Sequence, residues 1–270
     1  MKIKKTGKTY KYHKNGNLIC KQEKSNINKK WLKALKHVVK VYVKEFKDEI
    51  HSIYVRGSVA NGQAIDNFSD IDLIIFLHEQ KDSVAKSIQE YQEKTKNTIF
   101  KEYPFVTALE LGLAPINYVA KHRYEMSFIL KHMAICMYGK DLSKNFRKFT
   151  KRDFFRVYGH IDGTCDKINK SEIIRRSSYK SLIRSAFYII CDEVDVFTYD
   201  LYPIMKMFTK IFPETKKVFK IIMLGAISLE EPKRLNEEDY QEVLTFSKWL
   251  NTAIKFKKEN YHDLERNIKR

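Results

Sequence analysis

Two aspartates separated by one residue lie at the start of the most apolar stretch of the chain. Asp70 and Asp72 lead into Leu73-Ile74-Ile75-Phe76-Leu77, a run typical of a buried strand. Alternate side chains of a strand share a face, so the two carboxylates should lie close together. Two adjacent anions at the end of a core strand are costly unless a cation lies between them, and oxygen ligands favour Mg²⁺. The pattern predicts a metal site; the alternative is a solvated pair at a strand edge.

A Gly-Ser pair precedes the aspartates. Gly57-Ser58 follows Ile53-Tyr54-Val55, which predicts a short strand ending in a turn. Glycine lets the backbone approach a phosphate closely, and the serine hydroxyl and nearby amides can donate hydrogen bonds to its oxygens. A phosphate cradle beside a metal-binding carboxylate pair is the minimum equipment for nucleotidyl transfer.

These residues, in this order and on a strand–turn–strand context, resemble the signature of the DNA polymerase β nucleotidyltransferase superfamily. The resemblance covers about residues 50–77 and rests on Gly57-Ser58 followed by Asp70-x-Asp72. It implies Mg²⁺-dependent transfer of a nucleoside monophosphate from an NTP, expected to be ATP. Gly57-Ser58 and the adjacent Arg56 would hold the phosphates, and Asp70 and Asp72 would hold two Mg²⁺ ions.

Two-metal phosphoryl chemistry commonly uses a third carboxylate, as a metal ligand or as the base for the attacking hydroxyl. Glu110 interrupts the β-like run Phe105–Leu111, where a charge is unexpected for a core strand. The superfamily similarly takes its third acid from a later strand or the helix after it. We therefore expect Glu110 to be a catalytic residue and metal ligand, with Glu125 as the second candidate and Glu102 as the third. The alternative is that Glu110 only faces solvent.

The composition is that of a folded protein with reduced cysteines. At 270 residues, with 43% hydrophobic and 13% aromatic content, the chain has the size of two domains. No apolar run reaches the length of a membrane span, and the first residues lack the apolar core of a signal peptide. We therefore expect no membrane partners. The cysteines are scattered without zinc-ligand spacing, which is typical of reduced thiols, so we expect a cytoplasmic protein. They are Cys20, Cys136, Cys165 and Cys191.

The charge is strongly positive. Lys and Arg number 51 against 33 Asp and Glu, a formal net charge of +18. Such a field favours polyanions, which include NTP and RNA. An AT-rich genome, which enriches Lys, Asn and Ile, would produce the same excess.

The order of elements predicts an α+β protein of three parts. Residues 1–26 form a hairpin appendage around Asn15-Gly16. Residues 27–142 form the nucleotidyltransferase domain, a mixed β-sheet with flanking helices. Residues 143–270 form a helical bundle. The expected elements are helix 31–50, strands 53–55 and 73–77, helix 80–98, strand 105–111, helix 128–137 with Gly139 as C-cap, helices 173–190, 203–212 and 215–227, a helix from 236 and a charged tail from 251.

The acceptor is suggested by a second, shorter resemblance. Tyr138-Gly-Lys-Asp-Leu142 is similar to the end of the catalytic domain in aminoglycoside nucleotidyltransferases, where a helical domain follows. This layout implies a hydroxyl of a small molecule of aminoglycoside type as acceptor, and a lysine of the helical domain, here Lys206, over the nucleotide. An RNA end such as that of tRNA, a protein side chain, and a non-catalytic nucleotide-binding relic are the alternatives. No template-reading module is visible, so we expect no DNA template.

One stretch could serve an RNA acceptor. Residues 144–160 mix basic and aromatic side chains, a composition that can bind nucleic acid. The preferred interpretation is an amphipathic linker helix with buried aromatics.

Overall fold

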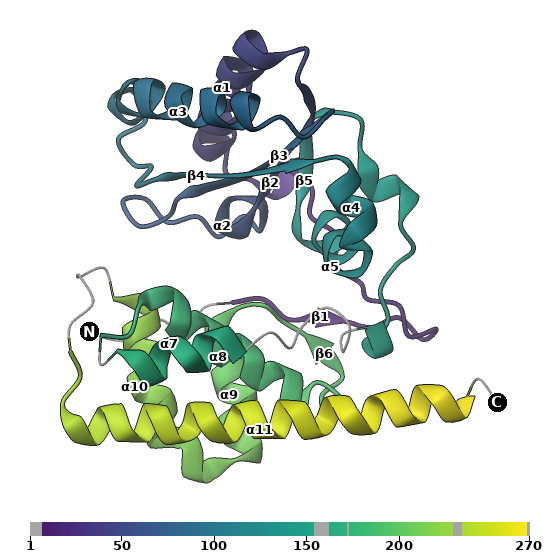
Figure 1. The fold of residues 1–270 in the computed structure, drawn as a ribbon, viewed down its shortest axis with the longest axis vertical. Coiled ribbons are helices and arrows are strands. Elements are labelled where there is room, and N and C mark those ends of the chain that lie inside the picture. Colours follow the sequence, from purple (N-terminus) through teal and green to yellow (C-terminus); the bar gives the residue numbers. More distant parts are fainter. Residues whose placement is uncertain (1–6, 154–161, 172, 229–233, 269–270) are drawn as a thin grey trace. The chain divides into compact units, whose positions relative to one another are not determined.

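The computed structural model describes residues 7–153, 162–171, 173–228 and 234–268, which form two compact units (Figure 1). The sheet unit comprises residues 20–148, and the helical unit combines the described residues up to Ile19 with those from Phe149 onward. The predicted α+β class, with a mixed sheet followed by helices, is confirmed. Within the described residues, no helix combines the length and apolar character that crossing a membrane requires.

The sheet unit is built on a four-stranded mixed sheet in the order β4-β3-β2-β5. Its strands are β2 (Ile50–Arg56), β3 (Ile71–Leu77), β4 (Leu109–Pro115) and β5 (Ile135–Gly139). β2 runs antiparallel to both β3 and β5, whereas β3 and β4 are parallel. The carboxyl end of β2 therefore lies beside the amino ends of β3 and β4.

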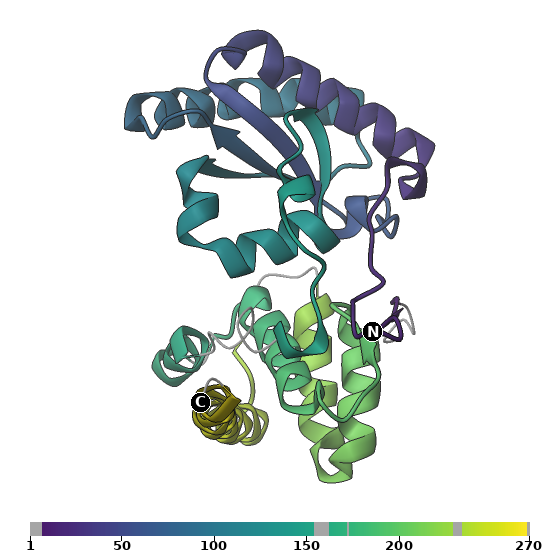
Figure 2. The ribbon, with the colours of Figure 1, turned by 90° about the vertical axis from the view of Figure 1, so that its right-hand side faces the viewer.

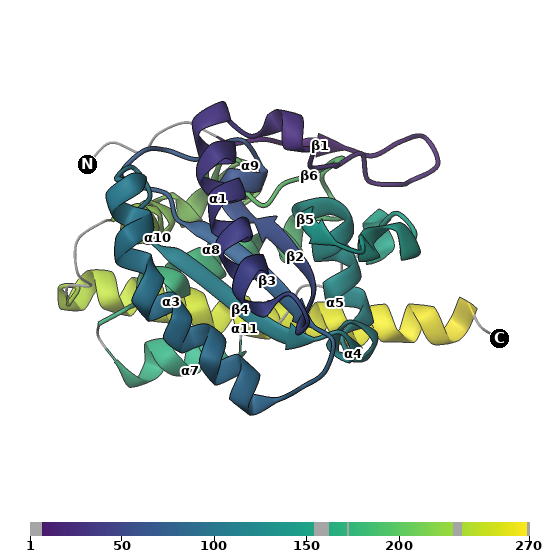
Figure 3. The ribbon, with the colours of Figure 1, turned by 90° about the horizontal axis from the view of Figure 1, so that it is seen from above.

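Helices cover both faces of this sheet. α1 (Lys29–Phe46) and α3 (Asp82–Glu102) lie together over one face, as Figure 3 shows from above. α4 (Asn117–Lys121) and α5 (Arg123–Phe128) supply apolar side chains to the core on the other face. The helices predicted over residues 31–50 and 80–98 are confirmed as α1 and α3. The apolar stripe of each helix faces the sheet.

Strand β3 alternates between the two cores. Leu73 and Ile75 pack in the cluster under α1 and α3, whereas Ile74 and Phe76 belong to the cluster on the other face. Alternate residues of a strand point to the same face, so the Asp72 side chain lies on the face of Ile74 and Phe76. Its carboxylate therefore leaves the sheet on the side away from α1 and α3.

The helix predicted over residues 128–137 is wrong. α5 ends at Phe128, a π-helical turn follows over Ile129–Met133, and residues 135–139 form β5. Gly139 (φ +77°) ends this strand opposite Ser52 and caps no helix. The apolar run is a strand because it completes the hydrogen bonds of β2, whose second edge would otherwise be unpaired. The strand that carries Glu110 also begins later than predicted, at Leu109.

Within the described residues, the helical unit packs four helices against a central one, α8 (Arg176–Ile190). Its core is aromatic and aliphatic, and it includes Leu182, Phe208, Phe219 and Ile222 from three of the helices. Figure 2 shows α11 nearly end-on beside the others. The tail predicted from residue 251 is the continuation of α11. The helices are α7 (Asp162–Lys170), α8 (Arg176–Ile190), α9 (Leu201–Ile211), α10 (Lys216–Ile227) and α11 (Glu237–Ile268).

The N-terminal segment belongs to the helical unit. The Asn15-Gly16 turn forms, with Gly16 at φ +79°, but the strand before it, β1 (Tyr10–Lys11), pairs with β6 (Val196–Phe197). The backbone N–H of Lys8 donates to Asp200 at 2.6 Å. The units thus divide after residues 19 and 148, compared with the predicted boundaries after 26 and 142. Residues 154–161 of the basic, aromatic stretch lie outside the described residues.

Candidate active site

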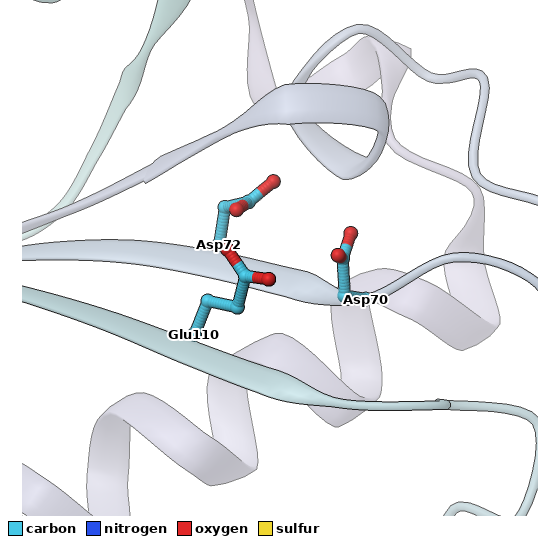
Figure 4. A group of neighbouring side chains, drawn as sticks. All are labelled: Asp70, Asp72 and Glu110. Atoms are coloured by element: carbon cyan, nitrogen blue, oxygen red, sulfur yellow. The ribbon is translucent and has the colours of Figure 1, made fainter. Parts of the chain in front are cut away.

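Three carboxylates meet at the edge where β2 ends and β3 and β4 begin. Asp70 directly precedes β3, Asp72 is its second residue, and Glu110 lies on β4. The parallel register places Asp72 directly beside Glu110. Each of the three offers an oxygen within 4.8 Å of the others, and Figure 4 shows them rising from the same side of the two strands. The structure therefore brings together the three acids that the sequence selected for the metal.

The electrostatics of this group indicate that it needs a cation. Burial of the Asp72 carboxyl, and next the charge of Asp70, raise its pKa from 3.8 to about 7, and Glu110 adds to the rise. Arg56, its cross-strand neighbour on β2, lowers the pKa of Asp72 but does not cancel these effects. Three oxygen donors without nitrogen or sulfur suit a hard divalent ion such as Mg²⁺. The residues thus fit the metal that the superfamily implies.

This charge balance leads to a prediction about stability. Without metal, the raised pKa of Asp72 contributes stability that is fully present below about pH 4 and lost as the pH rises through about 7. Mg²⁺ binds the ionised carboxylates, so it should raise the melting temperature by several degrees at about pH 8 and far less at about pH 5. Thermal unfolding with Mg²⁺ or with EDTA measures both. An equal Mg²⁺ effect at the two pH values, or the same effect in Asp72→Asn, would contradict this reading.

Gly57 is required by the position of Asp72. It begins the short helical turn α2 (Gly57–Ala60) with φ at +71°, in the left-handed region that side chains disfavour. A Cβ added there would overlap the Asp72 carboxylate oxygen. The glycine thus lets the turn lie directly against the metal-binding group.

Ser58 offers a hydroxyl with no partner. Its Oγ is buried and neither donates nor accepts a hydrogen bond within the described part of the chain. Its backbone carbonyl accepts from the N–H of Gln63 at 2.8 Å, which closes the turn. Buried hydroxyl groups normally have a hydrogen-bond partner, so the Ser58 hydroxyl is available to a ligand oxygen.

Positioning residues that the sequence did not reveal hold this edge together. The carbonyl of Ser69 accepts from both the backbone N–H and the hydroxyl of Thr107, at 3.1 and 2.9 Å. The Ser69 hydroxyl accepts from the N–H of Ile65, and the Trp31 indole donates to Asp66 at 3.2 Å. These bonds fix the loop before Asp70 and align β4 with β3. No sequence signal marks the Thr107–Ser69 and Trp31–Asp66 bonds, because their partners lie 38 and 35 residues apart along the chain.

The remaining sequence candidates lie elsewhere. Glu125 is exposed on α5 and is not in the carboxylate group, and Glu102 pairs with His37 at 3.1 Å. Arg56 is exposed at the end of β2, beside the site. Lys206 is exposed on α9 of the helical unit.

Comparison with known proteins agrees with this geometry. Residues 32–134, which contain all three carboxylates and the Gly-Ser turn, match the family model described as nucleotidyltransferase domain. The search of curated proteins gave no match. Among solved structures, the chain is similar to spectinomycin adenyltransferase AAD(9) from Enterococcus faecialis with ATP and spectinomycin, at 13% identity and a TM-score of 0.49, over 83% of this chain and 98% of that one. We base no functional assignment on so distant a likeness. The family match and the site together identify residues 32–134 as a nucleotidyltransferase domain, and the protein as an enzyme that contains it.

Proposed function

We propose that the protein transfers a nucleoside monophosphate from an NTP, with ATP as the expected donor, to an acceptor hydroxyl. The acceptor oxygen forms a bond to the α-phosphorus as the bond from that phosphorus to the pyrophosphate oxygen breaks. The hydroxyl proton passes to a carboxylate or to solvent, and pyrophosphate leaves. The observation that carries the proposal is the set of three carboxylates within 4.8 Å of one another, beside the Gly57-Ser58 turn.

Each residue of the site has a defined role in this reaction. Asp70, Asp72 and Glu110 would hold Mg²⁺, two ions in the superfamily's scheme, which neutralises charge on the triphosphate as the leaving group departs. The Ser58 hydroxyl and the adjacent backbone of Gly57 would position the β- and γ-phosphates.

Two cations are assigned to the nucleotide as well. Arg56 ends β2 beside the carboxylates, where its guanidinium can pair with phosphate oxygens. Lys206 of the helical unit is assigned only by the resemblance described above. If it contacts the triphosphate, Lys206→Ala should raise the KM for the nucleotide.

The third carboxylate is proposed to be Glu110 and not Glu125. The parallel register places Glu110 directly beside Asp72, whereas Glu125 is exposed on α5. As a metal ligand or as the base for the acceptor, a carboxylate must lie within reach of the reacting group.

Transfer can be tested directly. The protein is incubated with each of the four α-labelled NTPs, Mg²⁺, and either total RNA or a panel of aminoglycosides, and the labelled product is identified. The expected result is label on an acceptor, Mg²⁺-dependent and strongest with ATP. Nucleotide binding without release of pyrophosphate under any condition would favour the non-catalytic relic instead.

The expected location is the cytoplasm. The four cysteines are free thiols, which fits that location.

The acceptor is proposed to be a small molecule of aminoglycoside type, as the layout of the chain implies. The net charge of +18 favours the alternative, an RNA end. Multiple phosphate contacts would weaken RNA binding by about 100-fold or more between 50 and 200 mM salt, whereas the KM of a neutral small acceptor should change less than about threefold. Measuring the acceptor KM across this range distinguishes the two. A steep loss of affinity would replace the small-molecule acceptor by RNA.

A further inference from the structure

The helical unit contains an open groove that the proposed transfer does not use. It lies where α10 and the turn before it (Pro213–Thr215) pack against α11; the two helices are labelled in Figure 1. Its volume is about 780 Å³. Sites for small organic molecules typically enclose about 300–1,000 Å³ and are lined by apolar groups with a few polar ones. The groove therefore has the size of a ligand site.

Its wall is aromatic and open to solvent. The Trp249 ring stacks on Phe246 with centroids 5.7 Å apart and meets Phe212 edge-on at 5.7 Å. Trp249 is nevertheless 41% exposed, whereas the other tryptophan of the chain, Trp31, is 1% exposed. An indole face left open to water is a favourable surface for a cation or for another apolar ring.

The rim of the groove is acidic, in contrast to the rest of the chain. Glu214, Glu238 and Glu242 line it together with a single basic residue, Lys217. Three carboxylates against one ammonium give a local formal charge of −2, whereas the whole chain carries +18. Negative charge beside an aromatic wall favours cations and opposes nucleotides and nucleic acid.

The one basic group is already neutralised. Lys217 donates to Glu238 at 2.6 Å and also to Glu242, and these ion pairs connect α10 to α11. The pair with Glu238 raises the pKa of Lys217 and lowers that of Glu238, so this ammonium and this carboxylate both stay ionised at neutral pH. Glu214 makes no ion pair within the described residues and remains available to a ligand.

We propose that this groove binds an organic cation with an aromatic or aliphatic ring body, the ring against Trp249 and the charge toward the carboxylate rim. The proposal is independent of the nucleotidyl transfer proposed above, because every group that it uses lies within the helical unit.

Tryptophan fluorescence tests this site with the whole chain. Phenyltrimethylammonium is titrated as the cationic probe and benzenesulfonate as an anion of similar size. We expect saturable quenching by the cation, with an affinity at least about tenfold higher than for the anion. Equal or tighter binding of the anion, or the absence of saturable quenching, would overturn the proposal.

Two variants test which residues bind the cation. Their binding is measured by calorimetry, because Trp249→Leu removes the tryptophan whose fluorescence reports on the groove. Trp249→Leu should weaken cation binding by about tenfold or more, and Glu214→Gln by about threefold, with the cation's preference over the anion reduced. Glu214 is exposed, so its variant should fold even if the tryptophan variant does not. Unchanged binding in Glu214→Gln and Trp249→Leu would contradict the assigned groups. A dimer in light scattering that Trp249→Leu converts to monomer would assign the groove to a second copy and overturn the proposal.

Discussion

Replacing Asp70 and Asp72 together by asparagine is expected to reduce nucleotidyl transfer by at least about 1,000-fold, because the amides cannot hold the divalent ions that stabilise the transition state. The expected loss corresponds to about 4 kcal/mol of transition-state stabilisation. Pyrophosphate release under saturating ATP, acceptor and Mg²⁺ measures it. Undiminished turnover would refute the assigned roles.

The same variant should not unfold, and this separates lost chemistry from lost structure. In the metal-free protein, burial of the Asp72 carboxyl, and next its repulsion by Asp70, raise the pKa of Asp72 to about 7. The double variant should therefore melt at or above the temperature of the parent at about pH 8 in EDTA. Asp48→Asn, an exposed isosteric exchange in the same unit, should change neither activity nor melting temperature.

Two further glutamine variants discriminate between the candidates for the third carboxylate. Glu110→Gln should lower kcat by about 100-fold, and Glu125→Gln by less than about twofold. The reverse result would assign the role to Glu125 despite its exposure on α5.

Gly57→Ala is expected to lower activity by at least about 100-fold, through a single methyl group that touches no substrate directly. The added Cβ overlaps the Asp72 carboxylate oxygen, so either the carboxylate leaves its place among the ligands or the α2 turn moves away. The left-handed conformation at φ +71° adds a strain of about 1–2 kcal/mol, which denaturant unfolding will measure.

Gly16 provides a matched control for the strain alone. It lies in the N-terminal turn at φ +79°, and a Cβ there meets nothing within 4 Å. Gly16→Ala should therefore cost about 1–2 kcal/mol of stability from the backbone conformation alone, with transfer unchanged. If the two variants lost activity equally, strain and not the collision with Asp72 would explain the effect. Full activity in Gly57→Ala would show that the close approach of turn and carboxylate is not needed.

The sequence by itself determined the features that depend on neighbours along the chain. The Asp70-x-Asp72 spacing places two carboxylates at one strand end, and the apolar stripes of α1 and α3 are readable because each helix presents one side to the sheet. Glu110 could be predicted as a site residue because a charge is unexpected within a β-like run. Nothing in the local sequence indicated that it lies beside Asp72.

Only the tertiary structure decided the features that depend on distant partners. The parallel register of β3 and β4 places Glu110 beside Asp72, and the unpaired edge of β2 makes residues 135–139 a strand where the local pattern predicts a helix. Pairing of β1 with β6 likewise assigns the N-terminal segment to the helical unit. A strand obtains its hydrogen bonds from whichever chain segment lies beside it, and that neighbour is fixed by the packing of the whole unit and not by the local sequence.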